Sequence, residues 1–427
     1  MQRLDARAPG FAAAFDQLVE AGRETDIAIA GQVQQIIADV ARLGDAALTA
    51  LTLKYDRINL DEVGIEVTAD EIDAACASVA PELMDALRLA ADRIRAFHAS
   101  QIPADHESVD AAGVRAGWRW GPVDAVGLYV PGGLASYPSS VLMNAIPAKV
   151  AGAGRLVMTT PTPDGRMNPA VLAAARLAGV DTVYRVGGAQ AVAALAYGTA
   201  TISAVDKIVG PGNAWVAEAK RQLYGRVGID MVAGPSEILV VADAQNDPAW
   251  IAADLMSQAE HDPTAQAILI TDSDAFADAV CAAVEVQIGQ LPSTSSTRTS
   301  WDAHGAVIVI GSMDEAPALI DRLAPEHLEL AVDDPQALFA RIRHAGSVFL
   351  GRYTPEAIGD YLGGPNHVLP TGRRARFSSG LSVADFMKRT TFLDCSAEAI
   401  AAIGPAAATL ADSEGLPAHA ASVRVRL

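Results

Sequence analysis

The sequence is poor in cysteine, and its few cysteines are scattered. Its 427 residues include Cys76, Cys281 and Cys395, and no two of them form a CxxC pair. This usage is typical of a reducing compartment and argues against a disulfide framework or a thiolate metal site. The first residues also lack an apolar core followed by a small-residue cleavage site, so we expect no secretory signal and a cytoplasmic protein.

Basic residues and long apolar runs are also scarce. The chain has 32 Lys and Arg against 51 Asp and Glu, a formal net charge of −19. Nucleic acids and anionic membrane surfaces need a basic face, so neither is expected as a partner. The longest uncharged run, residues 125–148, is broken by prolines, glycines and serines, so no membrane span is expected. A hydrophobic content of 51% instead indicates a globular protein with large cores.

What the sequence does contain is a helical beginning followed by alternating strands and helices. In the first 110 residues, apolar side chains recur at helical spacing, as in 33–43 and 83–97. Later, short Val/Ile-rich runs alternate with Ala-rich helical stretches, which is typical of parallel sheets covered by helices on both faces. The runs are "AVGLYVPGG", "RLVMTTP", "DTVYRVGG", "DKIVGPGN", "EILVVAD", "AILITDSD", "AVIVIG" and "SVFLG". Their number predicts an α/β protein with two Rossmann-like parallel-sheet domains, a helical N-terminal region and a small C-terminal tail.

Three Gly-rich turns follow predicted strands of the first group. They are "YVPGG" (129–133), "VGGAQ" (186–190) and "VGPGN" (209–213). Glycines at such turns let backbone N–H groups and a helix N-terminus approach a phosphate. None is a full GxGxxG fingerprint, and each alone is more often a tight turn that needs a positive φ. Three of them along one sheet favour a ligand crevice at the carboxyl ends of its strands.

Histidines next to carboxylates form a second group. His261 follows Gln258 by three residues at a predicted helix end, which predicts a shared helix face. The further pairs are Glu326 with His327, Asp360 with His367, and Glu414 with His419. Each histidine alone is more often a surface or hydrogen-bonded residue, but their placement at element ends is where sites are built. Nitrogen and oxygen donors without thiolates suit zinc or another first-row ion.

Covalent thiol catalysis is not expected from this sequence. It would require a cysteine at the active centre. Cys76 and Cys281 lie in predicted helices, and Cys395 follows a loop without a nearby histidine.

Taken together, the motifs resemble those of the histidinol dehydrogenase family. They are "GLYVPGG", "VGGAQAVAALAYGT", "KIVGPGNAWVAEAKRQL", "AGPSE", "SQAEHDP", "PEHLEL", "GPNHVLPTG", "RFSSGLSV" and "EGLPAHAASVRVR". The resemblance runs in order from about residue 20 to the C-terminus. It implies a zinc-dependent, four-electron oxidation of L-histidinol through L-histidinal to L-histidine, the last step of histidine biosynthesis, with two NAD used in sequence.

The resemblance also implies roles for individual residues. The zinc ligands, one ion per chain, fall on Gln258, His261, Asp360 and His419, and the general bases on Glu326 and His327. Substrate contacts are implied at Ser236, Glu414, His327 and the metal ligands, and cofactor contacts at Tyr129, Gln190 and Asn213. Because both bases should reach one substrate, we expect a turn or helix start at 325–327, since neighbours on a regular strand point to opposite faces.

The same resemblance shapes the expected domain organisation. It implies a homodimer in which the C-terminal tail reaches the active site of the partner. We divide the chain into an N-terminal arm (1–22) packing with the tail, a first α/β domain joining 23–128 to 237–377, a second, NAD-side Rossmann-like domain (129–236) and a dimerisation tail (378–427).

Two other functions remain open at this stage. A related zinc and NAD dehydrogenase of another small polar alcohol, such as a sulfonated diol, would share the metal and base residues. A non-catalytic two-lobed binding protein for a small amino acid is the more distant alternative, and the Glu326–His327 pair argues against it.

Overall fold

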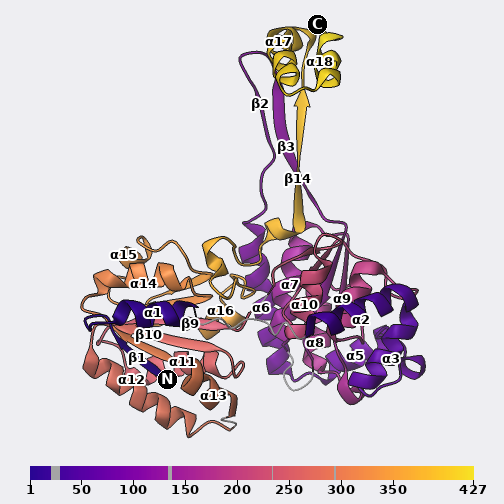
Figure 1. Cartoon of the computed structure of the whole chain (residues 1–427). Helices are drawn as coiled ribbons and strands as arrows, with labels where there is room; N and C mark the ends of the chain where they lie inside the picture. The colour runs from indigo at the N-terminus through magenta and orange to yellow at the C-terminus, as the bar shows by residue number, and fades with distance from the viewer. Residues whose placement is uncertain (21–28, 133–136, 233, 293–294) are drawn as a thin grey trace.

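The computed structural model consists of two α/β bodies and an arm that projects from them (Figure 1). It describes residues 1–20, 29–132, 137–232, 234–292 and 295–427. Three sheets organise these residues: a six-stranded sheet A, a five-stranded sheet B and a three-stranded sheet C. No described helix has both the length and the apolar character that a membrane span requires.

Sheet B is parallel and has the strand order β6-β5-β4-β7-β8. Its strands are β4 (Ala125–Tyr129), β5 (Arg155–Thr159), β6 (Thr182–Tyr184), β7 (Lys207–Val209) and β8 (Gly228–Ile229). The chain forms β4 first and adds β5 and β6 on one side of it, and then adds β7 and β8 on the other side. The order reverses between β4 and β7, and in open α/β sheets such a reversal leaves a crevice at the carboxyl ends of the strands.

Sheet A is also parallel, with the order β1-β11-β10-β9-β12-β13. Its strands are β1 (Gln2–Asp5), β9 (Glu237–Ala242), β10 (Gln266–Thr271), β11 (Ala306–Val309), β12 (His327–Ala331) and β13 (Ser347–Leu350). From β9 onward it repeats the order of sheet B, and β1 is added at one edge. The prediction of two Rossmann-like parallel sheets is therefore confirmed, and the eight apolar runs that predicted strands all contain one.

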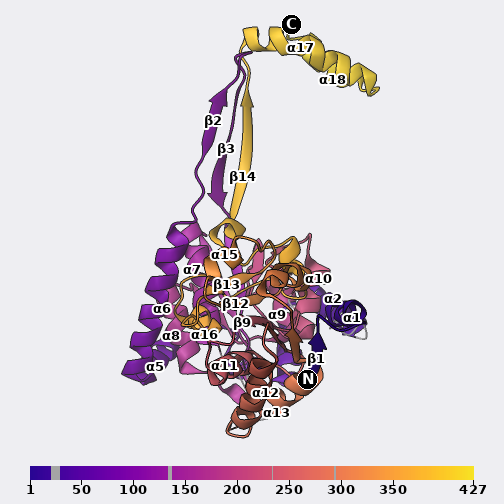
Figure 2. The same cartoon turned by 90° about the vertical axis from the view of Figure 1, so that its left-hand side faces the viewer.

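Helices cover both faces of each sheet (Figure 2). Successive apolar side chains of a strand point to opposite faces of the sheet, so each face needs a cover of helices. The helices around sheet B are α2 (Ala30–Leu43), α3 (Asp45–Tyr55), α4 (Leu60–Val63), α5 (Ala69–Ser78), α6 (Pro81–Ala99), α7 (Pro138–Ala151), α8 (Pro169–Ala178), α9 (Gly188–Tyr197) and α10 (Ala214–Leu223). Those around sheet A are α1 (Phe11–Glu20), α11 (Pro248–Ala259), α12 (Asp274–Ile288), α13 (Ser295–His304), α14 (Ala316–Leu323), α15 (Pro335–Phe339) and α16 (Glu356–Tyr361).

The helical N-terminal region packs on sheet B, which corrects the expected joining of 23–128 to 237–377. The apolar stripe of α2, including Val33 and Ile37, shares one core with β4, β5 and α9. The stripe of α6, including Leu87 and Ile94, shares the opposite core with β4, β5, α7 and α8. The periodicity identified these faces, but it could not say which of two similar sheets each face would cover.

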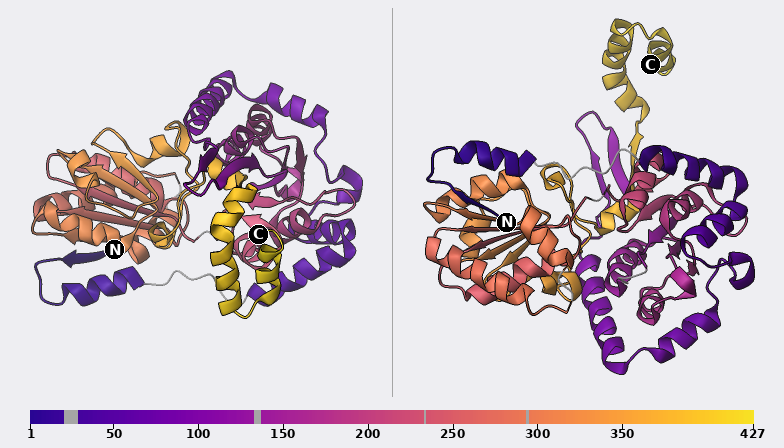
Figure 3. Two further views of the ribbon diagram at one scale, coloured as in Figure 1. Left: turned by 90° about the horizontal axis from the view of Figure 1, so that it is seen from above. Right: turned by 60° about the horizontal axis from the view of Figure 1, so that its bottom comes forward.

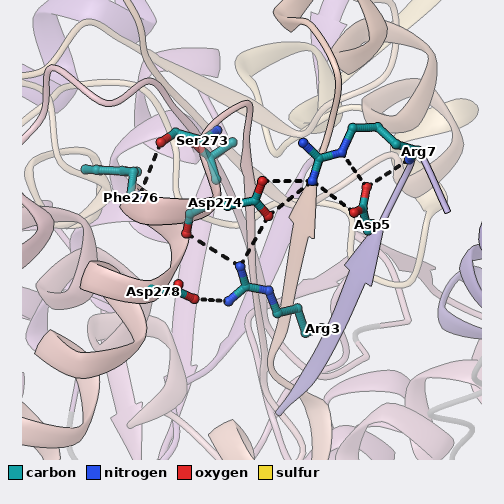
Figure 4. Close-up of polar contacts among 8 residues, drawn as sticks. Arg3, Asp5, Arg7, Ser273, Asp274, Phe276 and Asp278 are labelled. Atoms are coloured by element: carbon teal, nitrogen blue, oxygen red, sulfur yellow. Dashed lines mark hydrogen bonds and ion pairs between the residues drawn. The ribbon is translucent and has the colours of Figure 1, made fainter.

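The N-terminal arm belongs to sheet A, and within the described chain it packs on that sheet and not on the C-terminal tail. Strand β1 pairs in parallel with β11, and Leu4 and Phe15 are buried against that sheet. The arm is also held by charge: Arg3 pairs with Asp278, and Arg7 donates 2.8 and 3.1 Å hydrogen bonds to the carboxylate of Asp274 (Figure 4). These contacts fix the strand at an otherwise open sheet edge.

Sheet C forms the projecting arm and carries the C-terminal tail (Figures 1 and 2). Its antiparallel strands are β2 (His106–Val109), β3 (Arg115–Pro122) and β14 (Met387–Asp394), and the tail adds α17 (Ala397–Ser413) and α18 (Pro417–Arg424). The sequence predicted loops and one helix beyond residue 378, so β14 and α18 are additional. These strands lack the run of buried apolar residues that predicted eight strands of the two parallel sheets, because most of their side chains are exposed.

A buried histidine connects the helices of sheet B to the loop that follows α16. The imidazole of His98 is fully buried; its Nδ1 lies 2.8 Å from the carbonyl oxygen of Ile94, and its Nε2 lies 3.4 Å from the amide nitrogen of Asn366. Asn366 also donates a 2.6 Å hydrogen bond to the carbonyl of Met143 in α7. A carbonyl at Nδ1 and an amide donor at Nε2 require the neutral ring, and burial lowers the pKa of His98.

This buried neutral imidazole predicts a pH-dependent contribution to stability. The unfolded chain takes up a proton near pH 6.5, whereas folded His98 resists protonation to lower pH. Its contribution should therefore be complete above about pH 6.5 and decrease as the pH falls, by at most ~1.4 kcal/mol per pH unit. Thermal midpoints of the wild type and His98→Gln should accordingly converge between pH 8 and pH 5.5. A constant difference across that range would contradict the assignment.

Candidate functional site

A cleft of about 350 Å³ lies between the two bodies, where opposite edges of the sheets meet. Sheet B contributes the turns after the carboxyl ends of β4 and β7, at Pro131 and 210–213. Sheet A contributes residues at the amino ends of its strands: Ser236 just before β9, and Glu326 and His327 at the start of β12. The crevice expected from the Gly-rich turns therefore exists, with the amino edge of a second sheet as its opposite wall.

A bend before β12 brings Glu326 and His327 to the same cleft. The chain turns after Ala324, whose φ is 45°, and Glu326 precedes the strand that His327 opens. We expected a turn or helix start here; the structure has a bend without a helix. Glu326 Oε2 accepts a 2.9 Å hydrogen bond from the N–H of Glu237, and His327 Nδ1 lies 3.1 Å from the carbonyl oxygen of Glu237.

The contact with Glu237 also fixes the tautomer of His327. A ring nitrogen facing a carbonyl must carry the hydrogen, so Nδ1 donates and Nε2 has a free lone pair. That Nε2 is buried without a hydrogen-bond partner and lies 3.7 Å from Glu356 Oε1 and 3.9 Å from Asp360 Oδ1. His327 therefore presents an unprotonated nitrogen to a group of carboxylates.

Gln258 and His261 lie together at the end of α11, as their spacing predicted. The amide nitrogen of Gln258 is 3.0 Å from Nδ1 of His261, and the side-chain oxygen of Gln258 is buried without a partner. His261 lines the same cleft as Asp360 and His327. The structure thus brings three of the four expected metal ligands to one region.

The fourth expected ligand, His419, and the expected substrate contact Glu414 are not there. Glu414 directly follows α17 and His419 lies in α18, and both residues are exposed. Figure 3 shows the C-terminal helices at the end of the projecting arm. The cleft of one chain contains neither residue.

Two further residues complete the polar cluster around Asp360. Glu356 lies one helical turn before Asp360, and His327, Glu356 and Asp360 each place a ligand atom within 4.8 Å of the others. His367, a weaker candidate from the sequence, has its Nδ1 3.1 Å from the carbonyl oxygen of Asp360 and its Nε2 3.5 Å from Ser140 Oγ. The sequence analysis missed Glu356, although carboxylates spaced i, i+4 in "PEAIGDY" were a usable signal.

Burial perturbs every ionisable group of this cluster. Desolvation raises the pKa of Glu326 well above its usual value and raises the pKa of Glu356 and of Asp360 to about 7. It lowers the pKa of His261 and His327, and it lowers the pKa of His367 to about 4. The ion pairs among described residues join none of these carboxylates to Lys or Arg.

Uncompensated carboxylates, neutral imidazoles and unpartnered buried polar atoms together fit a divalent cation. The unpartnered atoms are Gln258 Oε1, His327 Nε2 and Glu356 Oε1. The donor set contains only nitrogen and oxygen, which zinc accepts.

The expected cofactor residues line the carboxyl edge of sheet B. Tyr129 ends β4, and its buried hydroxyl accepts a 3.1 Å hydrogen bond from the N–H of Gly188, while Gln190 is buried in the first turn of α9. Asn213 caps α10 by accepting from the N–H groups of Trp215 and Val216. Of the three, Asn213 lines the cleft itself.

The turn after β7 is tightly constrained. A side chain at Gly210, whose φ is 115°, would lie 2.0 Å from the carbonyl oxygen of Tyr129. Asp230 accepts a 2.8 Å hydrogen bond from the N–H of Gly210. The buried ammonium of Lys220 donates a 3.0 Å hydrogen bond to the carbonyl oxygen of Gly210 and forms an ion pair with Asp230. This turn is therefore held rigidly beside the cleft.

Comparison with known proteins shows which family the chain belongs to. The family model for histidinol dehydrogenase matches residues 20–427. The chain is 65% identical to histidinol dehydrogenase of Zymomonas mobilis over 425 residues, covering 100% of this chain and 99% of that protein. It is 62% identical to that of Rhodospirillum rubrum, covering 100% and 98%. The crystal structure of histidinol dehydrogenase from Elizabethkingia anophelis superposes with a TM-score of 0.95 at 38% identity, covering 100% of this chain and 98% of that one. The chain belongs to the histidinol dehydrogenase family.

Proposed function

We propose that the protein oxidises L-histidinol through L-histidinal to L-histidine, the last step of histidine biosynthesis, using one zinc ion per chain and two NAD in sequence. The observation that carries this proposal is the buried group of His327, Glu356 and Asp360, which faces the Gly-rich edge of sheet B across one cleft. Family membership supplies the substrate class.

Gln258, His261 and Asp360 would hold the metal, with His419 as a fourth ligand. When bound, zinc supplies a Lewis acid that can hold the amine and imidazole nitrogens of the substrate, and NAD supplies the hydride acceptor. The protein contributes orientation, a water-poor site and proton acceptors.

His327 and Glu326 are proposed as the two bases. The lone pair on Nε2 of His327 can take the hydroxyl proton while hydride leaves the carbinol carbon. The second oxidation requires hydration of the aldehyde, and the Glu326 carboxylate can take the proton from the attacking water. Burial favours the protonated form of Glu326, and a cation beside the site would favour its ionised, basic form.

The carboxyl edge of sheet B is proposed as the NAD-binding side, with contacts at Tyr129, Gln190 and Asn213. A second cavity of about 480 Å³ continues along this edge over the turns after β4 and β5. It shares Pro131 with the catalytic cleft. Two adjoining cavities suit an elongated dinucleotide whose reactive ring enters the cleft.

The projecting tail supports a homodimer with shared sites. Strand β14 pairs with β3 along all eight residues from Met387 to Asp394, so it cannot fold back. Eight strand residues span roughly 26 Å, which keeps Glu414 and His419 away from their own cleft. A partner's cleft is where they could complete the site. The same two residues favour a cationic amino alcohol over another small polar alcohol, such as a sulfonated diol, as the substrate.

The first test measures stoichiometry and metal dependence together. Protein purified without chelator should contain about one zinc per chain and form about two NADH per L-histidinol consumed. Chelation should abolish turnover but leave circular dichroism unchanged, because the two α/β cores do not depend on the ion. A metal-free protein with full activity, or oxidation of a sulfonated diol in preference to histidinol, would contradict the proposal.

The second test separates the bases. Glu326→Gln should impair the oxidation of supplied L-histidinal by about 10²–10⁴-fold, the usual loss on removing a general base, and slow the first hydride transfer less. His327→Asn should slow the oxidation of L-histidinol as well. Single-turnover NADH formation from each substrate measures both steps, and equal losses in the Glu326 variant would rule out this division of roles.

The third test mixes subunits. Homodimers of Glu326→Ala and of His419→Ala should both be nearly inactive. After dissociation and random reassociation, half of the dimers are mixed and carry one intact site, so activity should recover to roughly a quarter of wild type. Sites built within single chains would give no recovery.

A further inference from the structure

The Gly-rich turn after β7 is held by a buried ion pair to which the proposed reaction gives no role. Lys220 of α10 and Asp230, directly after β8, form this pair, and their side chains are 3% and 1% exposed. Side chains of a helix tilt toward its N-terminus, so Lys220 reaches back from within α10 to the turn that precedes the helix. Asp230 reaches the same turn from the neighbouring strand, because β7 and β8 are parallel and end at the same edge of sheet B.

The pair holds both backbone polar groups of a single residue, Gly210. Asp230 accepts a 2.8 Å hydrogen bond from the N–H of Gly210, and Lys220 donates a 3.0 Å hydrogen bond to its carbonyl oxygen. Asp230 is itself fixed by a 2.7 Å hydrogen bond from the N–H of Met231. The peptide planes on both sides of Gly210 are therefore set by charged side chains, whose hydrogen bonds are stronger than those of neutral groups.

Gly210 leads directly into residues that face the cleft. Pro211, Gly212 and Asn213 follow it, and all three line the cleft. The side-chain oxygen of Asn213 accepts hydrogen bonds from two backbone N–H groups of α10, and no described residue accepts a hydrogen bond from its amide nitrogen. The conformation of Gly210 therefore decides where this amide donor enters the cleft.

The stability of the fold does not by itself require this pair. Burying two opposite charges costs about as much as their attraction returns, and apolar side chains of similar volume are often equally or more stabilising. Apolar side chains would, however, leave the N–H and the carbonyl oxygen of Gly210 without these partners. The specific contribution of the pair is thus the conformation of the turn.

We infer that Lys220 and Asp230 are positioning residues for NAD: by fixing Gly210 they hold the turn 210–213, and with it Asn213, in the arrangement that binds the cofactor. This inference rests on the proposed NAD-binding edge of sheet B and adds two residues that act through the turn. The proposed metal and base residues belong to the opposite wall of the cleft, so loss of the pair should affect NAD more than zinc or L-histidinol.

The test removes the pair in two ways. Lys220→Met deprives the Gly210 carbonyl of its donor and leaves Asp230 unpaired, whereas Lys220→Met/Asp230→Asn buries no charge and keeps an acceptor for the N–H of Gly210. Both should raise KM for NAD and the dissociation constant of NADH about tenfold, a typical effect of losing a hydrogen bond to a charged group. At saturating NAD, kcat and KM for L-histidinol should stay within about threefold of wild type, and zinc content should not change.

Lys149→Met is the matched control. Lys149 of α7 forms a 3.0 Å ion pair with Asp181 at the partly exposed surface, and it does not line the cleft. The same substitution there should leave all of these constants at their wild-type values. NADH binding is measured by fluorescence titration, and folding by circular dichroism.

Each outcome decides one question. If neither variant changes KM for NAD, or if NAD, histidinol and zinc are all bound more weakly to the same extent, the pair serves the fold alone and the inference is wrong. If Lys220→Met does not fold, the double variant carries the test, and normal NAD affinity in it would overturn the inference. Failure of both variants to fold would likewise assign the pair to the fold alone. If the wild type itself binds no NADH and oxidises no histidinol, the proposed function fails instead.

Discussion

The central constraint in this molecule is the burial of several carboxyl groups around His327 without a basic side chain to neutralise them. Glu326, Glu356 and Asp360 all lie within 4 Å of that imidazole. By contrast, the buried acid Asp230 has a basic partner in Lys220. Burying unpaired ions is costly, and proteins avoid the cost by binding protons or cations at such places. The chemistry of the cleft follows from that requirement.

The two sheets explain how such a cluster can be assembled at the edge of a sheet. Both have the same order of strands, but sheet B uses its carboxyl edge at the cleft and sheet A its amino edge. The carboxyl edge provides Gly-rich turns and helix N-termini, which suit phosphate groups. The amino edge provides the first residues of β9 and β12 and the end of α11, where side chains rather than backbone N–H groups face the cleft. One edge is therefore suited to a cofactor and the other to metal and acid–base chemistry.

The sequence allowed eight of the eleven parallel strands to be predicted, because most fully buried strands are continuous apolar runs. Strand β12 was missed although it is buried, because His327 and Glu329 interrupt its apolar residues. The sequence also identified His261 with Gln258, since an i, i+3 pair is a local property of a helix. It could not assign α2 and α6 to a sheet, because an apolar helix face does not specify its partner. The strands of the projecting arm were not predicted, because β3 and β14 bury few apolar side chains and so contain no apolar run. These two strands are recognisable only by their pairing with each other.

The positions of the cysteines constrain how an aldehyde intermediate can be handled. Cys76 lies in α5, Cys281 in α12 and Cys395 just beyond β14, and none of the three lines the cleft. In the proposed reaction, an aldehyde in the cleft meets no cysteine of the same chain that could form a thiohemiacetal, so its second oxidation would proceed from the hydrate. That route needs a base for water beside a base for the alcohol, within reach of one carbon atom. The bend at Glu326, directly before the strand that begins with His327, provides two such groups on consecutive residues.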